Sequence, residues 1–154
     1  MAAGDGTVTM EGVRLMFRNF AGKEDQYNKE GDRNFAVAID ETVARQMAED
    51  GWNIKWLKPR EDDEGEGQEQ AYISVSIKFD VFPPHVVMVT SNNRTTLDES
   101  TIESLDYADI LNVDLIIRPY HWSVSGKSGI KAYVKTMFVT IEEDELVRKY
   151  SENL

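Results

Sequence analysis

Cysteine is absent from this chain of 154 residues, so it can hold no disulfide, no thiolate nucleophile and no zinc site built on cysteine. No apolar run approaches the ~20 residues that a membrane-spanning helix needs. The first six residues carry neither the basic start nor the apolar stretch of a secretory signal peptide. Together these absences predict a protein that works in the cytoplasm of a cell.

Basic side chains are scarce relative to acidic ones, and the formal net charge is −11. This imbalance counts against a nucleic-acid partner, because binding to phosphates relies on Lys and Arg. The acids are clustered, however. Fifteen of the 28 lie in the segments 61–69, 98–109 and 142–145, and outside these segments the bases outnumber the acids by four. The acidic segments can therefore be separate from a basic face.

Alternation of polar and apolar side chains predicts strands, because every second residue of a strand faces the same side. Apolar residues at helical spacing, preceded by Asp40 as N-cap and followed by Gly51, predict a helix over 41–50. Strands are expected over 7–20, 34–39, 53–58, 72–79, 85–90, 112–122 and 129–141, and short helices over 97–105 and 144–150. In the first strand Val13, Leu15 and Phe17 are expected on the buried face.

Six or seven strands with one or two short helices predict a mainly β protein, a small barrel of the OB-fold (oligonucleotide/oligosaccharide-binding) type. A β-sandwich gives a similar pattern and stays open as the alternative. We expect a single domain over residues 7–145, interrupted by a mobile acidic loop at 61–70, whose charge density prevents burial. Residues 146–154 are expected to form a C-terminal tail.

The last two predicted strands form a hairpin and carry the strongest functional signal. Val113, Leu115 and Ile117 share the apolar face of the first strand. The apolar face of the second is expected to hold Ala132, Val134, Thr136 and Phe138. The opposite face then interleaves rings with cations, namely Arg118, Tyr120, Trp122, Lys131, Tyr133 and Lys135. Rings stack on unpaired bases and cations follow the phosphates, so this face predicts a site for a single strand.

Other residues extend this interpretation. Arg14, Arg18, Lys58 and Lys127 are predicted to join Arg118, Lys131 and Lys135 in contacting phosphates, and Trp56 is predicted to stack on bases with Tyr120, Trp122 and Tyr133. Tyr, Trp and Lys also favour the half-exposed face of any strand, so ordinary sheet surface is the alternative. For Trp56 a place in the core is a further alternative, and Trp52 is expected to anchor the core.

Catalytic signals are missing. His85 and His121, the only histidines, have no nucleophile or metal-ligand spacing near them. The acidic run 61–69 lacks the alternating ligands of a calcium loop, and Gly126-Lys127-Ser128 lacks the upstream glycine of a phosphate-binding loop. We therefore expect no enzymatic activity, no cofactor and no metal.

A further pattern extends over most of the chain, from about Met10 to Glu145, and is carried by residues 12–23, 27–28, 31–37, 51–60, 112–122 and 126–133. This overall pattern resembles a family of small proteins encoded by phages of actinobacteria. Proteins of this family are described as single-stranded DNA-binding proteins with an OB-type barrel. Many proteins of this class end in an acidic tail with a hydrophobic tip. Here Arg148 and Lys149 interrupt the acidic end, which argues against recruitment of partners by such a tail.

The resulting hypothesis is a protein that binds single-stranded DNA without sequence preference during phage DNA replication or recombination, in the cytoplasm of the host cell. Phage or host replication proteins and a second copy of the chain are further partners that the sequence leaves open, and no membrane is expected. Two rivals remain. An acidic DNA mimic that binds a host protein suits the net charge, and a virion structural or adaptor protein is compatible with the sequence.

Overall fold

The computed structural model describes residues 6–26, 28–58, 69–80 and 83–143. Strands dominate this part of the chain, which confirms the mainly β class. The elements are β1 (Val8–Met10), β2 (Leu15–Asn19), β3 (Arg33–Ile39), α1 (Glu41–Glu49), β4 (Ile54–Leu57), β5 (Gln70–Ile77), β6 (His85–Val89), β7 (Arg94–Leu97), the 3-10 helix η2 (Ile102–Asp106), β8 (Ile110–Val124) and β9 (Lys127–Ile141).

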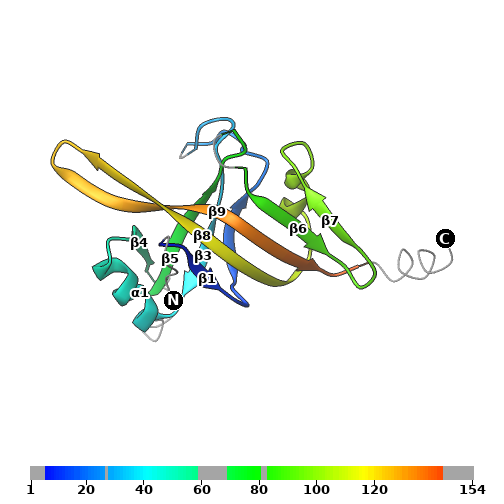
Figure 1. The fold of residues 1–154 in the computed structure, drawn as a ribbon, viewed down its shortest axis with the longest axis horizontal. Coiled ribbons are helices and arrows are strands. Elements are labelled where there is room, and N and C mark those ends of the chain that lie inside the picture. Colours follow the sequence, from blue (N-terminus) through cyan, green and yellow to red (C-terminus); the bar gives the residue numbers. More distant parts are fainter. Residues whose placement is uncertain (1–5, 27, 59–68, 81–82, 144–154) are drawn as a thin grey trace.

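Within the described residues nine strands form one sheet, whose main path follows the order β1-β8-β9-β5-β3-β2. β4 adds to β5, β6 adds to β9, and β7 adds to β6. β9 pairs in parallel with both β5 and β6, so it joins the two halves of the sheet. Figure 1 shows the β8–β9 hairpin, coloured yellow to orange, reaching beyond the rest of the sheet.

The ladders leave the sheet open between β1 and β2, and the short segment between these strands bridges the opening. β1 pairs with β8, whereas β2 pairs with β3. The backbone N–H of Val13 donates to the carbonyl of Val113 at 3.0 Å, and the carbonyl of Arg14 accepts from the N–H of Ala38 at 3.0 Å. The fold is therefore a small OB-like barrel that no continuous ladder closes.

The single strand predicted over 7–20 is wrong, because the chain there forms two strands with different partners. Gly12 separates them and has a φ of +61°, a left-handed conformation that glycine adopts without steric cost. This turn directs the chain from the edge of β8 to the edge of β3. The alternation of polar and apolar residues in the sequence continues through this turn, because both strands bury every second side chain in the same core.

The buried face predicted for the first strand is also wrong at Phe17. A β-bulge interrupts the β2–β3 register between Met16 and Asn19, and Phe17 has a φ of +51°. A bulge inserts one extra residue and turns side chains away from simple alternation. Val13 and Leu15 pack against the core as predicted, whereas the Phe17 side chain is 60% exposed.

The core fills the inside of the curved sheet. Val113, Leu115 and Ile117 on β8 are almost completely buried, as predicted, and the rings of Phe20 and Phe35 stack at 5.2 Å between centroids. Trp52 is buried in the same cluster, which confirms its predicted role as a core anchor.

The apolar face predicted for the second hairpin strand is wrong beyond Val134. Ile116 pairs with Thr136 and Ile117 with Val134, so Lys135 is the extra residue of a bulge in β9. After this bulge Met137 and Val139 are buried, and Thr136 and Phe138 pair with outward residues of β8. One inserted residue is enough to exchange the two faces of a strand.

Helix α1 begins at the predicted residue and ends at Glu49, one residue before the predicted end. The Asp40 carboxylate accepts a hydrogen bond from the Thr42 N–H at 3.1 Å, and Gly51 follows the helix with a φ of +104°. Ala44 and Met47 are buried, whereas Val43 is exposed. The helix covers the end of the barrel beside β4 and β5 (Figure 1).

The helix predicted over 97–105 is only partly correct. Leu97 belongs to β7, a strand that the sequence pattern missed because Arg94, Thr95 and Thr96 are all exposed and show no alternation. Only η2 is helical, and it is a 3-10 helix. Most of the predicted acidic loop, residues 61–68, and the predicted helix 144–150 lie outside the described residues, while Gln70 already belongs to β5.

Candidate nucleic-acid interface

The outward face of the β8–β9 hairpin brings together rings and cations from both strands. Arg118 pairs with Tyr133, Tyr120 pairs with Lys131, and Trp122 pairs with Gly129. Directly paired residues of antiparallel strands point to the same side, so these five side chains share one surface. We call the surface formed by Arg118, Tyr120, Trp122, Lys131 and Tyr133 the hairpin face. None of its residues lies among the buried ones.

Tyr133 is the centre of the hairpin face. The Tyr120 ring meets it edge-on, with centroids 5.9 Å apart and an interplanar angle of 86°. The Nζ atom of Lys131 lies 5.1 Å from the Tyr133 centroid, and the Nζ atom of Lys78 lies 5.7 Å from it. The edge-on geometry leaves Tyr120 55% exposed. A ring flanked by ammonium groups can stack on a base while the cations reach the adjacent phosphates.

Lys78 was missed as a site residue. The alternation predicted over 72–79 already groups it with Tyr72, Ser74 and Ser76, although β5 itself ends one residue earlier. What the pattern does not contain is the parallel contact between β5 and β9, in which Ser76 pairs with Tyr133. That contact brings the end of β5 to the hairpin face, and local periodicity gives no information about such a long-range partner.

Trp122 depends on the glycine opposite it. A Cβ atom added to Gly129 would lie 2.9 Å from Cζ2 and 3.0 Å from Cε2 of Trp122. Any larger residue at position 129 would therefore displace the indole. Packing of an aromatic ring over a cross-strand glycine is a known way to stabilise a sheet edge, and here it fixes the position of a half-buried tryptophan.

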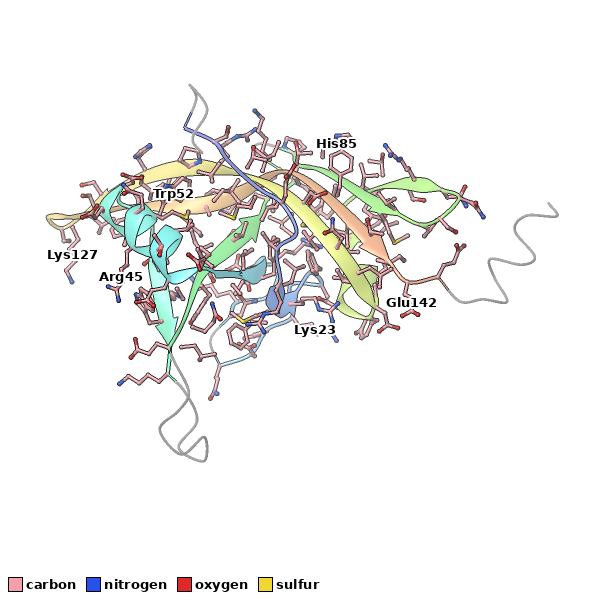
Figure 2. All side chains as sticks on the ribbon, turned by 90° about the horizontal axis from the view of Figure 1, so that it is seen from below. Lys23, Arg45, Trp52, His85, Lys127 and Glu142 are labelled. Carbon is pink, nitrogen blue, oxygen red and sulfur yellow. The ribbon has the colours of Figure 1, made fainter. Side chains whose placement is uncertain are left out.

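The tip of the hairpin is a two-residue turn at Ser125 and Gly126, with φ values of +51° and +80°. Positive φ at both central residues matches the right-handed twist of the flanking strands. The exposed Lys127 follows at once, and Figure 2 shows it at one end of the molecule. From Leu115 to Ile141 the sequence has no Asp or Glu and has four bases. The hairpin is therefore positively charged in a chain of net charge −11.

Lys135 and Arg118 complete the positive charge of the hairpin. Both are half-buried, and Lys135 lies at the β9 bulge, next to the body of the barrel. Bulges re-aim side chains at functional positions. The basic side chains of the hairpin therefore extend from Lys135, beside the barrel, to Lys127 at the turn.

Trp56 and Lys58 are not brought to the hairpin face. Trp56 pairs with the buried Ala71, so its side chain lies on the core side of β4, where it packs against the hydrophobic core. The Arg45 guanidinium, from α1, lies 5.2 Å from the Trp56 centroid. Lys58 follows β4 and is exposed.

Arg14 and Arg18 also lie away from the hairpin face. The Nη1 atom of Arg18 donates to the carbonyls of Leu105 and Ala108, both at 2.9 Å, so this guanidinium holds the end of η2. The exposed Arg14 directly precedes β2, with Nη2 3.8 Å from the sulfur of Met16. Both arginines line an open groove of about 650 Å³ that residues 12–15 and 108–112 also border.

A second ring and cation pair lies near η2. The Nζ atom of Lys23 donates to the Tyr107 hydroxyl at 3.0 Å and lies 5.6 Å from the ring centroid. This hydrogen bond raises the pKa of Lys23. Before η2, hydrogen bonds from Ser100 and Thr101 lower the pKa of Asp98. Of the acids in the segment 98–109, Glu103 and Asp106 belong to η2, whereas Asp109 directly precedes β8.

No group of three or more potential metal ligands occurs in the part of the chain that the structure describes. Among the same residues, no helix is long and apolar enough to cross a membrane.

An OB-like sheet that presents interleaved rings and cations is the arrangement by which single-stranded nucleic-acid-binding proteins hold their ligand. The chain belongs to a family of phage single-stranded DNA-binding domains: the family model described as "Putative phage ssDNA-binding domain" matches residues 5–153. This match confirms the resemblance to phage single-stranded DNA-binding proteins, and the actinobacterial hosts stay a prediction. No curated protein matches the chain.

Solved structures with the same fold include the single-stranded DNA-binding protein from bacteriophage Enc34. Its complex with ssDNA gives a TM-score of 0.60 at 14% identity and covers 92% of this chain and 89% of that one. A C-terminal truncation of the Enc34 protein gives a TM-score of 0.57 at 13% identity, with the same shares covered. At these identities the likeness concerns the fold, and it confirms the fold class.

Proposed function

We propose that this protein coats single-stranded DNA during phage DNA replication or recombination, without sequence preference and without catalysis, in the cytoplasm of the host cell. The hairpin face carries the proposal. Rings with exposed surface and flexible ammonium groups recognise features that all bases and phosphates share, so they favour binding without sequence readout. Family membership and the ssDNA complex of the Enc34 protein support the same ligand.

Within this proposal Tyr120, Trp122 and Tyr133 stack on bases, and Arg118, Lys127, Lys131 and Lys135 contact phosphates, joined by Lys78. The cations surround the rings, so a strand lying on the hairpin face meets both kinds of contact along its path. Trp56 and Arg18 have intramolecular contacts that account for them without DNA. We therefore assign them to the support of the fold.

Titration with poly-dT, followed by tryptophan fluorescence, tests the proposal. We expect quenching, because a base that stacks on Trp122 contacts its excited indole, while Trp52 lies in the core and Trp56 on the core side of β4. The affinity should fall as salt rises. An acidic DNA mimic would give no quenching and no binding at any salt concentration, and this result would refute the proposal.

Replacing Trp122 separates its stacking from its role as a reporter. Trp122→Ala should weaken poly-dT binding by more than ~1 kcal/mol, measured by anisotropy of a labelled oligonucleotide, because one stacked ring contributes ~1–3 kcal/mol. Trp122→Phe is the matched control: it keeps a ring over Gly129, so most of the affinity should remain while the fluorescence quenching disappears. An unchanged affinity in Trp122→Ala would move the site away from the hairpin tip.

A further inference from the structure

Phe17 combines backbone strain with exposure. Its φ of +51° is rare for a bulky side chain, because the Cβ atom then crowds the following backbone. The ring is 60% exposed, so burial of an apolar side chain does not offset this strain. Strained residues that persist on a surface concentrate at functional sites. The fold alone therefore does not explain why Phe17 keeps this conformation.

A second ring accompanies Phe17. Tyr72 of β5 meets it edge-on, with centroids 5.7 Å apart and an interplanar angle of 69°. Tyr72 pairs with Lys55 of β4 on one side and with Ala38 of β3 on the other. Ala38 in turn donates its N–H to the carbonyl of Arg14. Lys55 and Arg14 are both exposed, and the register places Lys55 directly beside Tyr72 and Arg14 one strand beyond Ala38.

This second cluster is continuous with the hairpin face across β5. Tyr72, Ser74 and Ser76 alternate on the outer side of β5, Lys78 follows the strand, and Ser76 pairs with Tyr133. Ser76 lies four positions after Tyr72 along the strand, which is a distance of ~13 Å. The side chains between the two clusters are serines, which are small and polar, and the segment 70–79 contains no acid. An extended strand of DNA could therefore cross β5 from one cluster to the other without meeting a large or negatively charged side chain of that segment.

From this arrangement we infer that Phe17 and Tyr72, with Lys55 and Arg14, form a second base-stacking subsite for the same DNA strand. The inference rests on the proposed function and extends it, because the bound strand then runs from the hairpin face over the serines of β5 to the edge of β2. The ligand class is unpaired nucleic acid, since the subsite offers open rings and two cations.

Phe17→Gly is the decisive variant, because glycine accepts a positive φ and so removes the ring together with the strain. Binding of labelled oligo-dT of about 4 and about 16 nucleotides, the range that one OB-type domain covers, compares a ligand that fills one cluster with a ligand that spans both. The longer oligonucleotide should lose affinity roughly 5- to 150-fold, and the shorter one, held at the hairpin face, should change less than about twofold. The melting temperature should equal or exceed that of the unchanged protein.

Tyr107→Ala is the matched control, because Tyr107 is an exposed ring beside a lysine but lies next to η2. It should leave the binding of both oligonucleotides unchanged. Photo-cross-linking with oligo-dT that carries 5-iododeoxyuridine gives a second measurement, and cross-links should map to Phe17 or Tyr72 as well as to the hairpin.

The possible failures are distinguishable. If the unchanged protein binds neither oligonucleotide, the proposed function itself is wrong. If it binds both, and Phe17→Gly binds the longer one equally well, only the second subsite is refuted. A variant that melts earlier and loses affinity for both oligonucleotides equally would identify Phe17 as a structural residue, and an equal loss in Tyr107→Ala would likewise overturn the assignment.

Discussion

Removing both tyrosine rings of the hairpin face, in the variant Tyr120→Ala/Tyr133→Ala, is expected to weaken poly-dT binding by at least about 30-fold. Each stacked ring contributes ~1–3 kcal/mol, so losing two costs ~2–6 kcal/mol, which corresponds to roughly 30- to 25,000-fold in affinity. The centroids of the two rings are 5.9 Å apart, so the losses of binding free energy in the two single variants should not simply add to the loss in the double variant. Anisotropy titrations of the two single variants and the double variant measure this coupling.

The matched control is Tyr120→Phe/Tyr133→Phe, which keeps both rings and removes only the hydroxyls. It should bind within a few-fold of the unchanged protein, because stacking depends on the π-face of the ring. Neither tyrosine belongs to the buried core, so thermal melting should confirm that the alanine variants remain folded. Undiminished binding by a folded double-alanine variant would exclude the hairpin face as the site.

The hairpin face could be predicted from the sequence because it depends on one local ladder. Antiparallel strands joined by a tight turn have their register fixed by that turn, and alternation then assigns every side chain to a face. Arg118, Tyr120 and Trp122 are opposite the buried Val113, Leu115 and Ile117, as expected. The prediction failed only past Val134, where the bulge at Lys135 exchanges the faces.

The remaining parts of the site depend on contacts that have no local signature. The parallel pairing of Ser76 with Tyr133 joins segments more than fifty residues apart, and it alone brings Lys78 to the hairpin. The period-2 pattern also gives no information about the left-handed backbone at Phe17, and for this reason the sequence wrongly predicted a buried ring there. Trp56 shows the converse case: its sequence neighbours are cationic, yet strand pairing turns it to the core side.

Binding should depend strongly on salt because of the basic side chains of the hairpin, although the net charge of the chain is −11. Arg118, Lys127, Lys131 and Lys135, together with Lys78, offer five phosphate contacts. Each contact with a single strand contributes a slope of about −0.7 to the plot of log affinity against log salt, so five contacts give about −3.5. Between 50 mM and 200 mM salt the affinity for poly-dT should therefore fall about 100-fold.

Neutralising the two lysines beside Tyr133, in Lys78→Gln/Lys131→Gln, should reduce that slope to about −2 and the fall over the same salt range to about 20-fold. The control Lys29→Gln/Arg94→Gln removes the same charge from exposed positions in the loop before β3 and on β7, so it changes the net charge equally. It should leave the slope of log affinity against log salt unchanged, because counterion release depends on the basic side chains that contact phosphates and not on the total charge. Equal slopes in the two variants would mean that long-range charge, rather than contact at the hairpin face, sets the salt dependence.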